Sequence, residues 1–398
     1  MSWPTYSLDQ LGELSRGRSR HRPRDAAHLY GGPYPFIQTG DVKATPLYLN
    51  KYSQTYSEAG LAQSKLWPKG TLCITIAANI AETAILDIDA CFPDSVIGFV
   101  ANEEKADTKF IKYLFDTVLK SKIRGVSRGA AQDNLSQEKL LSFKFPVPAL
   151  TIQKRISTTL CAYDDLIENS GRRSALLEEA ARLLYREWFV HLRFPGHEHA
   201  KITNGVPEGW EQKTLGDVVA TNPESYKAGK LPEVLNYIDI SSVSTGKIDS
   251  KTEMAAFNAP GRARRKAQNG DVIWSNVRPN LRAYALVTDP AENDVFSTGF
   301  TVLRSKLLNP FFMYFFVTSN SFVDHLVNHA TGTSYPAVRP EDFEKAEIVV
   351  PPVPLLDAFA EICRPQFQQI AKLHAQSLQA VKARDMLLPR LMDGRIEV

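Results

Sequence analysis

The sequence predicts an α+β protein with an internal duplication: two similar globular domains separated by a pair of long helices packed as an antiparallel coiled coil. Two observations carry this prediction. The stretch GAAQDNLSQEKL, which begins at Gly129, has a counterpart in GTSYPAVRPEDF, which begins at Gly332. Each stretch is followed by an extended piece closed by prolines and then by a long helical pattern. Such self-similarity indicates that one supersecondary arrangement occurs twice in the chain.

The repeat extends through both halves of the sequence. Four further pairs of segments match in order: WPTYSLDQL with WEQKTLGDV, YPFIQTGDV with LNYIDISSV, KGTLCITIAAN with NGDVIWSNVRPN, and FIKYLF with FFMYFF. We therefore predict a first globular domain at 1–150, a central helix at 151–192, a linker at 193–208, a second globular domain at 209–354 and a C-terminal helix at 355–392.

Each globular domain is expected to consist of short strands with Gly, Pro and Asn turns, followed by one helix. This helix is predicted near residues 108–124 and, in the second copy, near 309–327. After the repeated stretch, Ser136 is a plausible N-cap for a short helix, and Pro340 occupies the favoured first helical position in the copy. The prolines that follow separate the globular part from the long helix.

The long helices show apolar residues at alternating steps of four and three, which is typical of a coiled-coil seam. Ser170 and Ser174 interrupt the first seam, and Gln366, Ser377 and Arg384 interrupt the second, so the heptads are imperfect. The residues predicted to pack the two helices together are Ile156, Leu160, Tyr163, Ile167, Leu177, Leu184, Trp188, Phe359, Ile370, Leu373, Leu387 and Leu391.

Composition excludes several classes of protein. The 398 residues are 43% hydrophobic and 23% charged, which is typical of a globular chain with cores of adequate size. No long apolar run and no signal-peptide pattern occurs, so we expect a cytoplasmic protein without a membrane partner. The four cysteines are scattered without a CxxC pair, which favours buried free thiols over a disulfide framework or a zinc site.

The net charge is only +3, but local clusters of basic residues suggest contacts with nucleic acid. The clusters lie in segments rich in Gly, Pro, Asn and Ser, where a guanidinium can reach a phosphate or a guanine edge. The alternative, a solvated charged surface, stays open for either cluster. The residues predicted to contact DNA are Arg16, Arg18, Arg20, Arg22, Asn79, Arg124, Arg128, Gln132, Arg262, Arg264, Arg265, Lys266, Asn276, Arg278, Asn280, Arg282, Ser334, Tyr335 and Arg339.

Two related domains in one chain suggest a reader of two DNA half-sites, because paired DNA readers address half-sites about one helical turn apart. Because the loops of the two copies differ, the half-sites should differ as well. The alternative is a non-enzymatic adaptor whose two domains bind proteins, with the coiled coil as a scaffold. A steep loss of binding with rising salt would favour the DNA reader.

The chain resembles the specificity (S) subunit of type I restriction-modification systems over essentially its whole length. The most specific pieces are GAAQDNLSQEKLLSFKFPVPALTIQKRI and WEQKTLGDV. The resemblance implies two target-recognition domains, with the helix pair as a ruler between them. It also implies double-stranded DNA, two methyltransferase (M) subunits and restriction or motor (R) subunits as partners. The second copy departs from the pattern, with Tyr335 in place of Gln132 and Leu356 in place of Gln153.

The sequence predicts no catalytic residue and no metal site. Asn309-Pro310-Phe311-Phe312 resembles the motif of an adenine methyltransferase but lacks its second proline, so Asn309 is interpreted as a helix start. The cofactor S-adenosylmethionine is therefore expected in the partner M subunits, as the family resemblance implies. His325 and His329 share a helix face, but a third ligand is missing. The aromatic run from Phe311 to Phe316 is expected to pack a core rather than to stack on bases.

Overall fold

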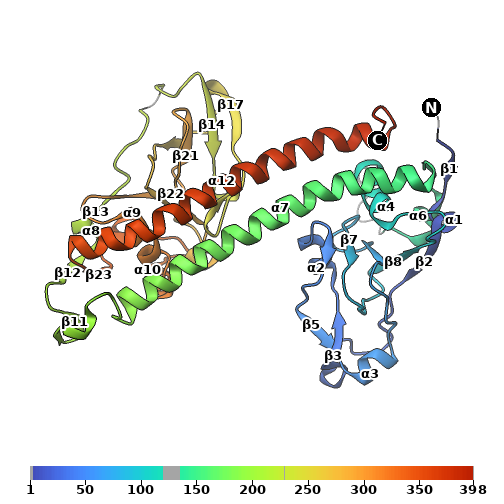
Figure 1. Ribbon diagram of the computed structural model, residues 1–398, viewed down its shortest axis with the longest axis horizontal. Helices are drawn as coiled ribbons and strands as arrows, with labels where there is room; N and C mark the ends of the chain where they lie inside the picture. The colour runs from blue at the N-terminus through green and yellow to red at the C-terminus, as the bar shows by residue number, and fades with distance from the viewer. Residues whose placement is uncertain (1–2, 120–134, 228, 398) are drawn as a thin grey trace. The chain divides into compact units, whose positions relative to one another are not determined.

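The computed structural model describes residues 3–119, 135–227 and 229–397 (Figure 1). The chain divides into two compact units. Unit 1 consists of residues 1–172 and 374–398, and unit 2 consists of residues 173–373. Each unit contains one globular domain together with parts of both long helices. We call the globular domains the first head (1–150) and the second head (209–354).

The first head is built around a five-stranded sheet with the order β2-β8-β6-β7-β4. Its neighbouring strands are antiparallel except β4 and β7, which are parallel. Its elements, with the long helix that follows, are β1 (Thr5–Tyr6), α1 (Leu8–Leu11), β2 (Gly12–Arg16), the 3₁₀ turn η1 (Ala27–Leu29), β3 (Tyr30–Phe36), α2 (Thr39–Ala44), β4 (Tyr48–Leu49), β5 (Gln54–Tyr56), α3 (Glu58–Ala62), β6 (Leu72–Thr75), β7 (Thr83–Leu86), β8 (Val96–Ala101), α4 (Thr108–Leu114), the π-helical turn η2 (Phe115–Leu119), α6 (Gln137–Ser142), β9 (Phe145–Pro146) and α7 (Leu150–Tyr185).

The second head contains two four-stranded sheets, β13-β22-β19-β20 and β17-β14-β21-β18. The remaining elements of the chain are the π-helical turn η3 (Arg186–Val190), η4 (His197–His199), β10 (Ile202–Thr203), β11 (Val206–Pro207), β12 (Glu211–Thr214), α8 (Leu215–Val218), β13 (Val219–Thr221), β14 (Val234–Ile238), η5 (Ile240–Ser242), β15 (Val243–Ser244), β16 (Lys247–Ile248), β17 (Thr252–Ala255), η6 (Ala256–Asn258), β18 (Ala263–Arg265), β19 (Val272–Ser275), η7 (Pro279–Leu281), β20 (Tyr284–Leu286), β21 (Asp294–Ser297), β22 (Phe300–Ser305), α9 (Pro310–Val317), α10 (Asn320–His329), α11 (Pro340–Glu344), β23 (Glu347–Val350) and α12 (Val353–Met392).

The predicted duplication is confirmed by strand order and register. The order β2-β8-β6-β7 in the first head is repeated as β13-β22-β19-β20 in the second. The strand at the start of each head pairs with the strand that precedes the long helix: Thr5 lies opposite Pro146, and Gln212 lies opposite Val349. These are corresponding positions of the two copies, so divergence of the sequence has preserved even the register.

The predicted helix starts are confirmed. The Ser136 hydroxyl accepts a hydrogen bond from the Lys139 amide at 3.1 Å, and the Asn309 side chain accepts one from the Phe311 amide at 2.9 Å. Pro340 is the first residue of α11. The prediction of one helix near 309–327 is wrong, because α9 ends at Val317 and α10 begins at Asn320. Ser319 caps the second of these helices through the Phe322 amide and so favours a new start over continuation.

The long helices α7, of 36 residues, and α12, of 40 residues, pack antiparallel within each unit. In unit 1 the start of α7 shares a core with the end of α12, and in unit 2 the end of α7 shares a core with the start of α12. Every residue predicted for the helix seam is buried or half-buried. Leu176 and Leu183, which lie off that seam, are 61% and 48% exposed.

The four cysteines are buried free thiols, as predicted. None of the helices in the described residues is both long and apolar enough to cross a membrane.

Candidate nucleic-acid interface

In both heads a strained turn follows the third strand of the shared strand order, which is β6 in the first head and β19 in the second. In the first head this turn comprises residues 76–82, with φ of 60° at Ala78 and 64° at Ala81. In the second head it comprises residues 276–282, with φ of 51° at Arg278 and 56° at Arg282. The left-handed conformation costs an L-residue about 1–2 kcal/mol. Strain of this kind, kept in both copies, is typical of functional sites.

The repeated stretch closes on this strained turn, which explains why the chain contains it twice. The Leu135 amide donates to the Ile76 carbonyl at 3.2 Å, and the Val338 amide donates to the Asn276 carbonyl at 2.9 Å. These are corresponding pairs in the two copies. In the second head the Arg278 amide also donates to the Pro336 carbonyl at 2.7 Å. The repeated stretch therefore holds the backbone of the turn in place.

The second head brings several predicted residues together on one surface. The Arg278 guanidinium lies over the Tyr335 ring, 4.7 Å from its centroid, and its Nη2 donates to the Ser334 carbonyl at 3.3 Å. The Tyr335 side chain is 70% exposed, and Asn280 is exposed at the tip of the turn. This surface therefore offers hydrogen-bond donors and an aromatic face to a partner.

Other side chains predicted to contact bases form hydrogen bonds within the protein. Asn276 accepts a hydrogen bond from the Thr301 hydroxyl at 2.7 Å and donates to the Thr298 carbonyl at 3.5 Å. Asn79 accepts one from Lys43 at 3.2 Å, and Arg282 Nη2 donates to Asn320 at 2.7 Å. Arg278 and Asn280 thus remain the exposed candidate readers on the strained turn of the second head.

The first basic cluster forms an alternating row. Arg16, Arg18 and Arg20 are exposed, whereas the intervening Gly17 and Ser19 are buried. A Cβ atom at Gly17 would lie 2.3 Å from the Phe92 carbonyl oxygen, so the chain passes too close to its neighbour there for a side chain. Extended backbone therefore projects the three arginines to one side. Arg22 differs, because its Nη1 donates to the Ser19 and His21 carbonyls.

Gln63 supports this row from α3's C-terminal end and was missed by the sequence analysis. Its side-chain oxygen accepts hydrogen bonds from the Arg20 amide at 2.6 Å and the His21 amide at 3.0 Å. The sequence contains no local signal for this contact, because the partners are more than 40 positions apart.

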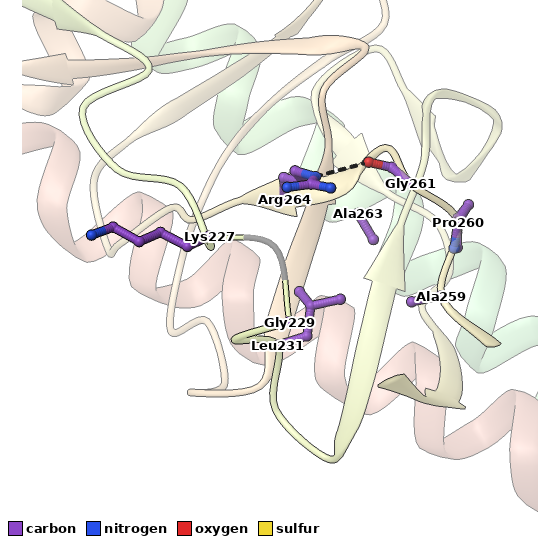
Figure 2. Close-up of a pocket in the computed structure, with 8 residues that line it drawn as sticks. All are labelled: Lys227, Gly229, Leu231, Ala259, Pro260, Gly261, Ala263 and Arg264. Atoms are coloured by element: carbon purple, nitrogen blue, oxygen red, sulfur yellow. Dashed lines mark hydrogen bonds between the residues drawn. The ribbon is translucent and has the colours of Figure 1, made fainter. Parts of the chain in front are cut away.

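The second basic cluster is more closely tied to its own domain. Arg262 is exposed, whereas Arg264 Nε donates to the Gly261 carbonyl at 3.0 Å and Arg265 Nη1 donates to the Ser225 hydroxyl at 3.1 Å. Lys266 lies 4.3 Å from the centroid of the Tyr226 ring. Figure 2 shows Arg264 and its bond to Gly261. Both residues line a cavity of about 100 Å³, as does Lys227.

Asp271 is the single acidic residue between Arg262 and Arg282, and it is paired with Arg304, which was not among the predicted site residues. Asp271 is 1% exposed and accepts hydrogen bonds from Arg304 at both carboxylate oxygens. Arg304 also contacts Glu224, and these bonds raise the pKa of its guanidinium. The Asp271 carboxylate therefore subtracts little from the positive charge of the nearby surface.

Three of the predicted residues, Arg124, Arg128 and Gln132, lie outside the described residues. Arg339 is exposed at the N-cap of α11, where its amide donates to Asp342 at 2.9 Å.

A tyrosine in each head is hydrogen-bonded to a carboxylate on α7. Tyr113 donates to Asp164, whose other oxygen lies 2.5 Å from Arg384 Nη1 on α12. Tyr314 donates to Glu178 at 2.8 Å, and Arg182 donates to the same oxygen at 2.7 Å. Neither contact was predicted from the sequence, although the tyrosine shared by FIKYLF and FFMYFF is a usable signal.

The described residues contain no group of three His, Cys, Asp or Glu side chains that could hold a metal ion. His325 and His329 each contact a backbone carbonyl at 2.8 Å, those of Asp342 and His325 respectively. The aromatic residues of α9 lie in or against the core of unit 2, as predicted.

Comparisons with known proteins agree with this architecture. Residues 2–179 match the family model described as the type I restriction modification DNA specificity domain. The specificity subunit of type I restriction enzyme MjaIX from Methanocaldococcus jannaschii is 24% identical, covering 100% of this chain and 94% of its own length. The HindI specificity subunit from Haemophilus influenzae is 21% identical, covering 99% of both chains. The crystal structure of a type I S subunit from M. genitalium shares the fold, with a TM-score of 0.60, 16% identity and coverage of 98% of this chain and 96% of that chain.

The duplicated heads, the paired helices and the basic surfaces define a two-domain DNA-specificity protein. Together with the family match and the relatives aligned over the whole chain, they confirm the resemblance found in the sequence. The first 179 residues carry the match to the type I specificity domain, and the chain as a whole is similar to specificity subunits of type I restriction enzymes. The matched model is described as a DNA specificity domain, and the relatives are named as specificity subunits.

Proposed function

We propose that each head reads one half of a bipartite, asymmetric DNA site. One observation carries the proposal: both heads hold the same strained turn through the same repeated loop, but they present different side chains on it. Ala78 of the first head corresponds to Arg278 of the second, and the second left-handed residue is Ala81 in the first head and Arg282, one position later in the turn, in the second. A common backbone with different side chains favours two different half-sites, because base edges are distinguished by side-chain donors and acceptors.

The exposed arginines supply the part of binding that is independent of sequence. Arg16, Arg18 and Arg20 in the first head and Arg262 in the second can reach phosphate oxygens, which fix the position of a protein on the duplex. Loss of affinity with rising salt, at a log-log slope of about 0.9 per contacted phosphate, would support this role. The two-headed protein adaptor is not favoured.

The helix pair is proposed to carry the partners. Two methyltransferase (M) subunits would bind along α7 and α12, and restriction or motor (R) subunits would join them for cleavage. S-adenosylmethionine would be bound by the M subunits. The exposed Leu176, Leu183 and Met386 supply apolar area on the outer faces of these helices. A further proposal is that the helices act as the ruler that sets the gap between half-sites.

Exchange of a head tests the proposal. Residues 205–350 would be replaced by the corresponding segment of another specificity subunit, and the complex with M subunits would be assayed by mapping methylated bases. We expect one half-site to change while the other and the gap stay the same. A change in both half-sites, or methylation without a bipartite site, would contradict the assignment of one half-site to each head.

A further inference from the structure

We propose that Arg278 reads a guanine in the half-site of the second head, with Tyr335 and the Ser334 carbonyl as positioning groups. This inference rests on the proposed function, since it assigns a base to a head that we propose to bind DNA. It begins from the side chains around the strained turn, where Arg278 combines a fixed backbone with an accessible guanidinium.

Three features fix the backbone conformation of Arg278. Its φ of 51° lies in the left-handed region, which an arginine adopts only when its surroundings enforce it. The following residue, Pro279, is buried and restricts the conformation of the residue before it. The Arg278 amide donates to the Pro336 carbonyl at 2.7 Å. The starting point of the side chain is therefore fixed before any ligand binds.

The guanidinium is held by its neighbours and keeps N–H donors for a ligand. Its Cζ lies over the Tyr335 ring, 4.7 Å from the ring centroid, and its Nη2 donates a hydrogen bond to the Ser334 carbonyl at 3.3 Å. A guanidinium has five N–H donors, so the remaining ones can form the pair of parallel bonds that guanine O6 and N7 accept. Within the described residues no carboxylate pairs with Arg278, in contrast to Arg304, which is bound to Asp271 and Glu224.

A guanine is favoured over a phosphate because the guanidinium is held at two points, by the Tyr335 ring and by the Ser334 carbonyl. A phosphate accepts hydrogen bonds from many directions, whereas a guanine edge requires a planar fork in a defined orientation. The first head provides the comparison within the same chain. Its corresponding residue is Ala78, so that head has no reader at this place, and its half-site should lack this contact.

The test uses the complex of this chain with its M subunits and a set of duplexes in which each base pair of the second half-site is replaced in turn. Wild-type discrimination between a bipartite site and random DNA must be seen first, and its absence would contradict the proposed function itself. Given that discrimination, Arg278→Ala should lose the preference for guanine at one position by about 5- to 150-fold. Preferences at all other positions, and in the first half-site, should stay the same.

Two further substitutions separate base reading from charge and from folding. Arg278→Lys keeps the positive charge but lacks the fork, so it should lose the same preference. Tyr335→Ala should weaken that preference, whereas Tyr335→Phe, which keeps the ring, should retain it. Arg262→Ala is the contrasting variant: as a phosphate contact, it should weaken all duplexes alike and lower the salt slope by about 0.9.

The inference is overturned if Arg278→Ala and Arg278→Lys leave every base preference unchanged. It is also overturned if Arg278→Ala weakens all duplexes equally and reduces the salt slope as Arg262→Ala does, since Arg278 would then contact a phosphate. If Arg278→Ala does not fold, the lysine variant alone decides, because it retains the stem and the charge of the arginine.

Discussion

Tyr113 of the first head donates a hydrogen bond to Asp164 on α7, and burial followed by this bond raises the pKa of the tyrosine. The same carboxylate is paired with Arg384 on α12, so a single side chain joins the head to both long helices. In the second head Tyr314 makes the corresponding bond to Glu178, but there the arginine, Arg182, belongs to the same helix as the carboxylate. The two heads are therefore joined to the helices by related but distinct contacts.

Removal of the arginine should destabilise unit 1. Arg384→Ala leaves the buried Asp164 without a charged partner, and we expect a loss of about 2–4 kcal/mol, somewhat below that for a fully buried pair. Hydrogen exchange in peptides from residues 3–119, measured in increasing urea, would follow this unit separately. Asp385→Ala is the matched control, because it removes the exposed partner of the same arginine and should cost less than about 1 kcal/mol. Equal effects of the two variants would show that the buried pair does not stabilise the unit.

The corresponding contact in unit 2 can be tested with two adjacent glutamates. Glu178 accepts bonds from Tyr314 and Arg182, whereas Glu179 is exposed. Glu178→Ala should lower the stability of unit 2 by about 1–3 kcal/mol, because the buried tyrosine hydroxyl loses its acceptor. Glu179→Ala should change it by less than about 0.5 kcal/mol. Hydrogen-exchange protection of peptides from residues 300–330 provides the measurement. Equal stability of unit 2 in the two variants would refute the role of Glu178.

Release of strain in the first head gives a third prediction. Ala78→Gly should stabilise unit 1 by about 0.5–1 kcal/mol, because glycine adopts φ of 60° without steric cost. Ala77→Gly is the control, since Ala77 is not in the left-handed region and the added backbone freedom should destabilise it by about 0.5–1 kcal/mol. Urea midpoints of unit 1 would distinguish the two, and destabilisation by Ala78→Gly would show that the turn is not strained.

A test of the helix pair as a ruler requires that both helices be lengthened together. Because each compact unit contains parts of α7 and α12, an insertion in only one helix should misalign the packing in one unit. Insertion of four residues after Arg172 together with four after Leu373 adds about 6 Å to each helix. The gap between half-sites should then grow by one or two base pairs at about 3.4 Å each.

A methylation map of the double-insertion variant supplies the measurement for this prediction. The bases of both half-sites should stay the same, because no residue of either head moves relative to its own loops. An unchanged gap with full activity would refute the ruler. The single-insertion variants serve as controls and should be less stable than the double variant.

The cysteines should be inert in the native protein. Burial raises the pKa of Cys363 to about 12 and also raises the pKa of Cys73, so at pH 8 the reactive thiolate is a minor form. Iodoacetamide at pH 8 should label none of the four cysteines in the folded chain and all of them in urea. The expected change in mass can be read by mass spectrometry, and rapid labelling of the native chain would contradict the burial of these side chains.

The sequence alone determined the duplication, because the repeated stretches, the proline-closed strands and the helical spacing are local patterns that survive divergence. Ser136, Asn309 and Pro340 were correctly placed at helix starts for the same reason, since a cap acts on amides within three residues. The break between α9 and α10 was missed because the apolar residues on both sides of Ser319 continue a helical pattern, although Ser319 itself carries the capping signal.

Only the tertiary structure decided which of the predicted DNA-contacting residues are accessible. Asn276 and Arg278 are neighbours in the sequence, yet one amide is occupied by Thr301 while the other side chain stacks on Tyr335 at the surface. Asp164 and Arg384 are 220 positions apart, and the sequence contains nothing local that would pair them. The physical reason is the same in both cases: local sequence fixes backbone conformation and periodicity, but the partner of a polar side chain is set by which distant segment the fold brings within hydrogen-bonding distance.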